Sequence, residues 1–316
     1  MRVLLTGASG FVGRWLAPEL QAVGHEVIAA PAKRELDLTT GSEAVGRLAE
    51  LLAATQPDAV AHLAGMAYGP DAAEDPEAAI AINAGGTAAL FDGLDAAGSS
   101  AAVLVASSGD VYGTPTRLPI GEDAPLAADD AYGRSKIEEE RAALSHHSRG
   151  RRLVISRSFN HTGPGQREVF AAPALARRVL ALKRGEASDI PVGNLDARRD
   201  FTDVRDVVRA YRLLLERLVA PPASASSSAS GASSPLPFDP PVVNVGSGHS
   251  VAIHEILETL CRLAAVPARS RVDPELLRPN DTPEICADVT RLQTLTGWSP
   301  SIPLDQTLAD LLASLA

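Results

Sequence analysis

A glycine-rich turn directly after the first apolar run constrains the fold more than any other feature. The run RVLLT at residues 2–6 leads into TGASGFVG, and a helix-like stretch begins at once. Between a strand and a helix, such glycines allow a tight turn and a close approach of the backbone to a pyrophosphate at the helix N-terminus. The pattern therefore predicts a dinucleotide-binding turn. The residues that we assign to it are Gly7, Gly10, Phe11, Val12 and Gly13.

Short aliphatic runs alternate with longer helix-like segments through the first half of the chain. The runs are RVLLTG, EVIAA, DAVAHLAG, AAVLVASS and RRLVISRS. Apolar runs of this length between helices are typical of strands buried on both faces of a parallel sheet. We therefore predict an α/β protein with a Rossmann-type, doubly wound parallel sheet and a smaller α/β substrate-binding lobe.

After about residue 158 the alternation of strand-like and helix-like segments becomes irregular. A short helix and a strand are expected again later, in RDVVRAYRLLLERL and VVNVGSG. A segment rich in Ser, Pro and Ala separates these two and has a composition that cannot bury a core, so we expect it to be a disordered and inert insertion. The predicted units are 1–157 with 204–220 and 241–246 for the dinucleotide domain, 158–203 with 247–316 for the substrate lobe, and 221–240 for the insertion.

Composition narrows the class of protein. The formal net charge of -10 argues against a nucleic-acid surface, so anionic groups of a ligand must meet local arginines. The N-terminus does not resemble an export signal, and no stretch is long and apolar enough for a membrane helix. Cys261 and Cys286 form no C-x-x-C pair. We expect a cytoplasmic protein without a structural disulfide.

Ser108, Tyr132 and Lys136 form the candidate catalytic set. Tyr132 and Lys136 are spaced four residues apart at the start of a predicted helix and so share one face. A neighbouring ammonium favours the phenolate, so we expect it to lower the pKa of the tyrosine. Ser108 follows the strand AAVLVAS, at the sheet edge where α/β proteins place a reacting ligand.

The second strand lacks the acidic residue that usually binds the adenosine ribose hydroxyls. EVIAAPAKRE places Ala30 and Pro31 there, followed by Lys33 and Arg34, which have the charge to meet a 2′-phosphate. We expect NADPH to be accepted at least as readily as NADH. A further strand region is expected near Leu36-Asp37-Leu38, where Asp37 has a carboxylate for an adenine amino group.

These motifs occur in an order that resembles the extended short-chain dehydrogenases/reductases, the NAD-dependent epimerase/dehydratase family, over essentially the whole chain. The motifs are TGASGFVG, AHLAG, INAGGT, ASSGDVYG, YGRSK, RSFNHTGP, RRDFTDVRDVV and LLRPNDTPE. Within that family, RSFNHTGPGQ, PELLRPND and LTGWSP look most like GDP-4-keto-6-deoxy-mannose reductases. The resemblance implies hydride transfer from NADPH or NADH to C4 of a GDP-linked keto-sugar.

The resemblance also assigns roles by position. Ser108 would hold the sugar carbonyl, Tyr132 would exchange the proton, and Lys136 would bind the nicotinamide ribose. Further cofactor contacts are implied for Asp37, Leu38, Leu63, Ala64, Gly65 and Asn83, and substrate contacts for Asp110, Asn160, Arg199 and Arg278. A homodimer packed through helices near 78–97 and 132–146 is implied as well.

Two alternatives remain at this point. A GDP-mannose 4,6-dehydratase or another nucleotide-sugar epimerase/dehydratase shares the fold, but Gly109 and Asp110 stand where related dehydratases place a polar or acidic residue followed by Glu. A non-catalytic NAD(P)-sensing protein would not need Ser108, Tyr132 and Lys136. No metal site is expected, because His146 and His147 are adjacent and do not share a helix face, and His62 and His161 are interpreted as structural.

Overall fold

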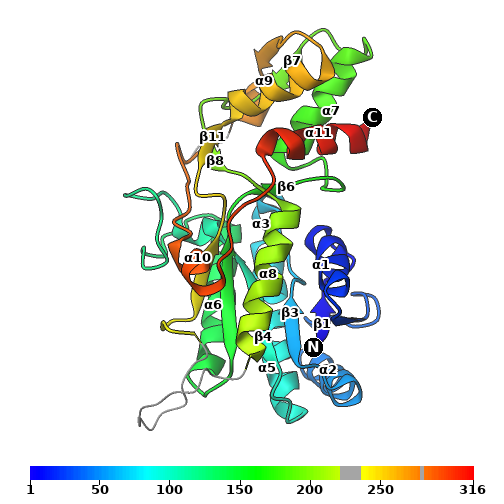
Figure 1. Ribbon diagram of the computed structural model, residues 1–316, viewed down its shortest axis with the longest axis vertical. Coiled ribbons are helices and arrows are strands. Elements are labelled where there is room, and N and C mark those ends of the chain that lie inside the picture. Colours follow the sequence, from blue (N-terminus) through cyan, green and yellow to red (C-terminus); the bar gives the residue numbers. More distant parts are fainter. Residues whose placement is uncertain (221–235, 278–280) are drawn as a thin grey trace.

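A parallel sheet of six strands forms the centre of the larger part of the molecule (Figure 1). The computed structural model describes residues 1–220, 236–277 and 281–316. The strand order is β2-β1-β3-β4-β5-β10, and all five predicted runs are strands. Their bounds are β1 (Arg2–Thr6), β2 (Glu26–Ala29), β3 (Ala59–His62), β4 (Ala102–Ser108), β5 (Leu153–Ser158) and β10 (Val242–Val245). Most of these strands are buried along their length, as the continuous aliphatic runs predict.

Helices cover both faces of this sheet. One face packs against α1 (Phe11–Ala22), α8 (Val204–Val219) and α10 (Thr290–Thr296). The other face packs against α2 (Ser42–Thr55), α5 (Gly86–Ala96) and α6 (Ala131–His147). Each face has its own apolar core, so the predicted doubly wound, Rossmann-type architecture is confirmed.

The segment before α5 contains an irregular turn. The short helices α3 (Gly69–Glu74) and α4 (Pro76–Ile80) precede a π-helical turn at Ala81–Gly85, and α5 continues from it. Single π-helical turns of this kind often occur at functional sites because the extra residue redirects side chains. Here the turn carries Asn83, which is fully buried.

The strand expected at residues 36–38 is wrong. This segment lies in a turn between β2 and α2, because the Asp37 carboxylate accepts hydrogen bonds from the Thr39 backbone N–H (3.0 Å) and hydroxyl (2.7 Å). An aspartate that bonds to the backbone two residues ahead stabilises a turn in competition with a strand ladder. Leu38 instead packs beside Gly86 at the start of α5.

A smaller lobe lies beyond the carboxyl ends of the strands (Figure 1). Its core is formed mainly by α7 (Ala171–Lys183), α9 (Ile253–Ala264) and α11 (Leu304–Leu315). Short two-stranded ladders accompany them: β6 (His161–Thr162) with β9 (Thr202–Asp203), β7 (Ile190–Val192) with β12 (Ser270–Val272), and β8 (Arg198–Asp200) with β11 (Ser250–Ala252). We propose that the sheet with its covering helices corresponds to the dinucleotide domain expected from the sequence. The smaller lobe would then correspond to the expected substrate lobe.

The predicted insertion falls mostly on residues 221–235, which lie outside the described residues. Two of its last five residues, Leu236 and Phe238, do pack against the molecule, contrary to the expectation of a wholly disordered segment. Leu236 is 4% exposed and joins the core under α8, and the Arg291 guanidinium lies 5.1 Å from the centre of the Phe238 ring. Two apolar side chains in this stretch are enough to hold its end against the core.

Leu236→Ala should lower the free energy of unfolding by about 2–5 kcal/mol, because it leaves a cavity in the core. Leu126→Ala, at a side chain that is 39% exposed, is the matched control and should cost far less. Urea unfolding followed by circular dichroism measures both. Equal stability of the two variants would show that residues 236–240 do not contribute to the core.

Candidate active site

A cleft of about 420 Å³ opens at the carboxyl ends of β1, β3, β4 and β5. Its walls include the turn after β1, the loop after β3, the end of β4, the first turn of α6 and the segment 158–170 that leads into the lobe. In an open parallel sheet this edge is where ligands bind, because the loops there diverge and the helix N-termini point toward it. The cleft is therefore the candidate active site.

The glycine turn forms one wall of the cleft, and all five residues predicted for it line the cavity. Gly7 has a φ of +70°, and a Cβ there would lie 2.7 Å from the Ala64 nitrogen, so no other residue fits. Gly10 precedes α1 and offers no side-chain cap, which leaves the helix N-terminus open to an anion. This cradle fits a dinucleotide pyrophosphate.

The loop after β3 is held in place from behind. Leu63 and Gly65 line the cleft, while the Ala64 backbone N–H donates to the Thr6 hydroxyl at 3.3 Å. Asn83 accepts from the Met66 N–H at 2.8 Å and donates to the Ser135 hydroxyl at 2.8 Å. Asn83 thus links this loop to α6 and lies behind the wall of the cleft.

Ser108, Tyr132 and Lys136 meet at the floor of the cleft. Helix α6 begins at Ala131 because the Asp130 carboxylate caps it, accepting from the Gly133 N–H at 2.9 Å. The Tyr132 phenol lies close enough to the Ser108 side chain to interact with it. The Lys136 ammonium, one turn further, donates to the Ala106 carbonyl at 2.9 Å. The three predicted catalytic residues are therefore brought together.

The electrostatics of Tyr132 differ from the expectation. Burial raises the pKa of its phenol, and the nearby Asp110 carboxylate raises it further, while the hydrogen bond with Ser108 lowers it. The expected lowering by Lys136 is not seen, because burial has the largest influence on this phenol. The Lys136 ammonium also pairs with the buried Glu139 carboxylate at 2.7 Å. A compensated ammonium does little to favour the phenolate.

A second buried ion pair fixes α6 against the sheet. The Glu140 carboxylate accepts from Arg157 of β5, with Nη2 at 2.7 Å, and from the Ser107 hydroxyl of β4 at 2.6 Å. Arg157 also donates to the Tyr112 hydroxyl at 3.0 Å. Such a pair keeps its geometry because its remaining donors and acceptors are satisfied. The first turn of α6 therefore has a fixed position beside Ser108.

The predicted substrate residues divide into two groups. Asp110 and Asn160 line the cleft. Arg199 instead pairs with Asp281, with Nη2 and Oδ1 2.5 Å apart, and neither side chain is more than 16% exposed. Arg278 lies outside the described residues. The structure thus brings only part of the predicted substrate set together.

Several residues that line the cleft were missed by the sequence analysis. Arg14 directly follows the glycine turn, and its Nη2 donates to the Gly165 carbonyl at 3.0 Å. Arg167 lies over the Tyr68 ring at 5.8 Å. The ring of His161 stacks on Phe11 with centroids 6.1 Å apart. Of these residues, only Arg14 could have been predicted from the sequence, because it directly follows the third glycine of the turn.

Four residues predicted for the adenosine end do not line this cavity. Among the described residues, the cleft lining includes none of Lys33, Arg34, Asp37 and Leu38. Lys33 and Arg34 are exposed, and Arg34 pairs with Glu35 at 3.0 Å. These side chains are on the surface beside β2, beyond the cavity.

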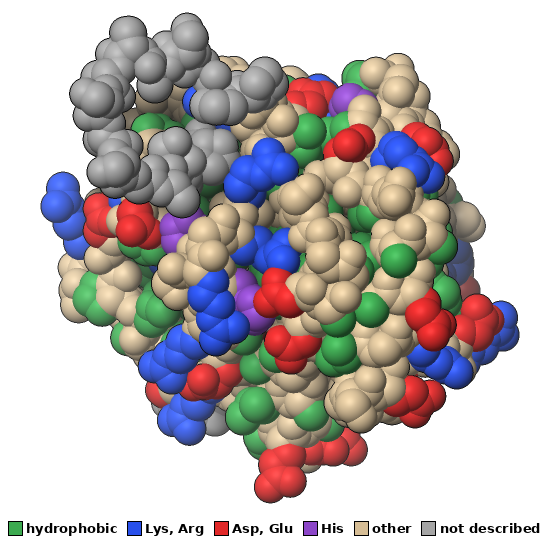
Figure 2. All heavy atoms as spheres, turned by 90° about the horizontal axis from the view of Figure 1, so that it is seen from below, with side chains coloured by type: hydrophobic (Ala, Val, Ile, Leu, Met, Phe, Trp, Pro, Cys, Tyr) green, Lys and Arg blue, Asp and Glu red, His purple; other side chains and the backbone are tan. Residues whose placement is uncertain are grey.

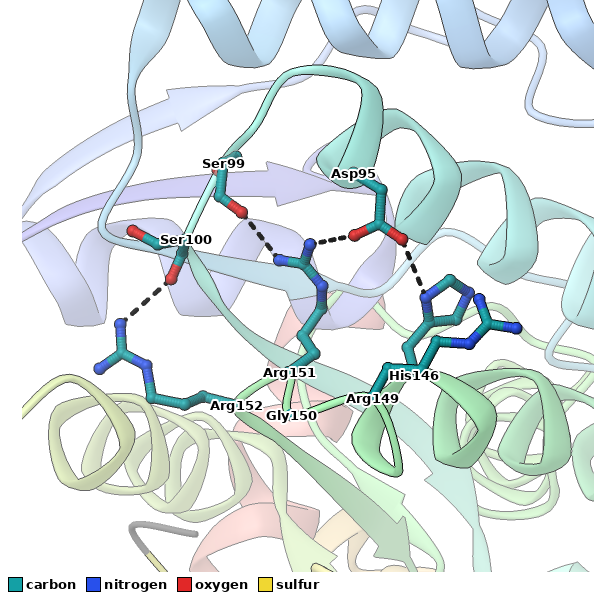
Figure 3. A pocket seen from close by; sticks show the side chains of 8 residues that line it. All are labelled: Asp95, Ser99, Ser100, His146, Arg149, Gly150, Arg151 and Arg152. Atoms are coloured by element: carbon teal, nitrogen blue, oxygen red, sulfur yellow. Dashed lines mark hydrogen bonds and ion pairs between the residues drawn. The ribbon is translucent and has the colours of Figure 1, made fainter. Parts of the chain in front are cut away.

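A smaller hollow of about 260 Å³ lies between the ends of α5 and α6 and is lined by basic residues (Figure 3). Arg151 binds the Ser99 carbonyl at 2.9 Å and the Asp95 carboxylate, and Arg152 binds the Ser100 carbonyl at 3.1 Å. These guanidinium groups tie the loop between α5 and β4 to the residues that precede β5. On the face of the molecule opposite the lobe, around this region, basic and acidic side chains are interspersed (Figure 2). The hollow has a structural role.

The chain outside the masked segments offers no cluster of three or more His, Cys, Asp or Glu side chains that would suit a metal ion. His62 is buried between Thr6 and Thr87, and the Nε2 of His146 lies 4.0 Å from Asp92. Within the same residues, no helix combines the length and apolarity needed to cross a bilayer.

Comparisons with known proteins agree with this geometry. Residues 3–225 match the model of the NAD dependent epimerase/dehydratase family. The chain is 36% identical to GDP-6-deoxy-D-mannose reductase of Pseudomonas aeruginosa, over 99% of this chain and 96% of the relative. It is 27% identical to a UDP-glucose 4-epimerase of Mycolicibacterium smegmatis, over 98% and 96% of the two chains. The structure of RMD from Pseudomonas aeruginosa complexed with NADPH superimposes with a TM-score of 0.84 at 34% identity, covering 99% and 98%.

Proposed function

Because the chain belongs to the NAD dependent epimerase/dehydratase family, we propose that it is an NAD(P)-dependent reductase that acts on C4 of a GDP-linked 4-keto-6-deoxy-hexose. The observation that carries the proposal is that Ser108, Tyr132 and Lys136 line the same cleft as the glycine turn. The similarity to a GDP-6-deoxy-D-mannose reductase over nearly the whole chain supports the choice of substrate. The proposed product is a GDP-6-deoxy-hexose such as GDP-rhamnose.

The glycine turn and the start of α1 would hold the pyrophosphate of the cofactor, with Leu63 and Gly65 beside it. When bound, the nicotinamide cofactor supplies the hydride for the reduction. NADPH is the favoured form in this proposal, because no carboxylate ends β2 and the basic Lys33 and Arg34 lie beyond it. NADH remains an alternative cofactor.

The side chains at the floor of the cleft would handle the proton. Ser108 donates to the ketone oxygen and orients it beside Tyr132. The Tyr132 hydroxyl gives its proton to that oxygen as it becomes an alkoxide, which forms the product alcohol. Lys136 would hold the nicotinamide ribose. Together these residues lower the barrier by placing donors where negative charge develops.

Arginines near the cleft would bind the diphosphate. Arg14 and Arg167 line it, and a planar guanidinium matches phosphate oxygens with paired hydrogen bonds. We retain Arg199 and Arg278 as proposed nucleoside-side residues, although Arg199 would have to exchange part of its contact with Asp281 for the ligand. Asn160 and Asp110 complete the proposed substrate side.

The steric surroundings of Gly109 argue against the 4,6-dehydratase. Gly109 supplies no acid-base side chain, and a Cβ at this position would lie 3.1 Å from the buried Phe159 ring, which is a tight contact. Asp110 alone would then have to abstract the C5 proton. A UDP-sugar epimerase and a non-catalytic sensor stay as weaker alternatives, because both are compatible with the fold. We further propose a cytoplasmic homodimer that packs through residues 78–97 and 132–146.

Tyr132→Phe should reduce turnover by at least two orders of magnitude, because general acid catalysis typically accelerates a reaction by roughly 10²–10⁴-fold. Affinity for NADPH should stay close to that of the unmodified protein, since only the proton-donating hydroxyl is lost. Tyr211→Phe also removes a hydroxyl from the cleft and is the matched control; it should retain most turnover. Steady-state kinetics and fluorescence titration with NADPH measure both. Near-normal turnover of Tyr132→Phe would remove this residue from the mechanism.

The reductase and the dehydratase differ in cofactor balance. Given GDP-4-keto-6-deoxy-mannose and NADPH, the enzyme should oxidise one NADPH for each sugar reduced. Given GDP-mannose and NADP⁺, it should form no keto-sugar, because Gly109 supplies no side chain and Asp110 reaches less far than a glutamate would. Chromatography of the nucleotide sugars with absorbance at 340 nm follows both reactions. Keto-sugar formed from GDP-mannose without net cofactor change, and lost in Asp110→Asn, would establish the dehydratase.

A further inference from the structure

Glu139 is a buried carboxyl group in direct contact with the lysine of the catalytic set. It is 1% exposed, and its Oε2 accepts from the Lys136 ammonium at 2.7 Å. The same ammonium donates to the Ala106 carbonyl at 2.9 Å. A lysine ammonium has three donors, so the protein fixes the direction of two of them. Glu139 therefore controls both the position of Lys136 and the net charge around it.

The other neighbours of Glu139 bring little charge to it. On α5, the Thr87 hydroxyl lies 3.4 Å from its Oε1, and on β3 the His62 Nε2 lies 3.0 Å from that hydroxyl. Burial, aided by the charge of Lys136, lowers the pKa of His62 to about 3, so this imidazole is neutral. On α6 itself, the neighbouring Glu140 is paired with Arg157. Lys136 is thus the cation that compensates Glu139.

Tyr132 lies in the field of the same groups. Besides burial, the carboxylates of Asp110 and Glu139 and the phenol of Tyr211 raise its pKa, and the hydrogen bond with Ser108 opposes them. An unopposed ammonium one helical turn away would act in the opposite direction and favour the phenolate. The Lys136–Glu139 pair is neutral as a whole, so it removes that influence.

We propose that Glu139 is a positioning residue that holds the Lys136 ammonium and, by opposing its charge, keeps the Tyr132 hydroxyl protonated over a wider pH range. The inference rests on the proposed function, in which Tyr132 must carry a proton to give to the substrate. If Glu139 acts in this way, the reductase stays active into the alkaline pH range. Without the carboxylate, the Lys136 ammonium would favour loss of the Tyr132 proton at a lower pH.

Burial raises the pKa of the Glu139 carboxyl, while the charge of Lys136 and the hydrogen bond with it lower that pKa. The Lys136 ammonium is thus the group that offsets the burial of this carboxylate.

The test replaces Glu139 by Gln, which keeps the side-chain size and an acceptor for Lys136 but removes the charge. Tyr132 ionisation is followed by tyrosinate absorbance, as the difference between each protein and its Tyr132→Phe counterpart. In Glu139→Gln the tyrosinate signal should appear at a pH lower by about one unit, a tenfold change in the ionisation constant. The alkaline limb of kcat/KM with NADPH should move by the same amount. Affinity for NADPH, from fluorescence titration, should change less.

Glu138→Gln is the matched control, because Glu138 lies on the exposed side of the same helix and pairs with Arg141. It should titrate like the unmodified protein. Should Glu139→Gln fail to fold, the double variant Lys136→Met, Glu139→Leu removes both charges at once. Because the pair is neutral overall, this variant should keep tyrosinate formation close to its original pH.

An unchanged tyrosinate titration in folded Glu139→Gln would overturn the proposal, and so would a large shift in the double variant. A uniform loss of activity at every pH would also overturn it, since that pattern indicates a purely structural role. Failure of the proposed function gives a different result. The unmodified protein would then not consume NADPH with the keto-sugar, while the tyrosinate titration would still report on Glu139.

Discussion

Two adjacent carboxylates on α6, Glu139 and Glu140, each bind one buried cation. Glu140 binds Arg157 of β5, and Glu139 binds Lys136 of its own helix. Both carboxylates are 1% exposed, so each depends on its partner to offset the cost of burial. The first pair fixes α6 against the sheet, and the second fixes the lysine against the floor of the cleft. The position of Tyr132 beside Ser108 follows from both.

The parallel sheet supplies the rest of the arrangement. All six strands end at the same edge, so the turn after β1, the loop after β3 and the end of β4 converge there. The glycine turn leaves the N-terminus of α1 bare, which suits a phosphate. The lobe then closes the cleft from the other side. One geometry therefore brings an anion site and a proton donor together, which a reductase needs.

The fold and the catalytic set could be predicted because they rest on local signals: aliphatic runs, a glycine turn, and a Tyr–Lys spacing on one helix. The strand expected at Asp37 could not, because a side-chain hydrogen bond to Thr39 favoured a turn. The raised pKa of Tyr132 comes first from burial and then from the Asp110 carboxylate, and both need the packed structure to be seen. Arg14 directly follows the glycine turn and so had a sequence signal, whereas Arg167 reaches the cleft only through the folding of a distant segment.

Isotopic transfer tests the central claim most directly. The reaction would use GDP-4-keto-6-deoxy-mannose and NADPH with both hydrogens at C4 of the nicotinamide replaced by deuterium, with the product sugar examined by mass spectrometry and NMR. Our account predicts one deuterium at C4 of the sugar for each NADPH oxidised, with the hydroxyl proton coming from the protein and solvent. Deuterium at C5 or C6, or a product formed without label while the cofactor stays reduced, would contradict it.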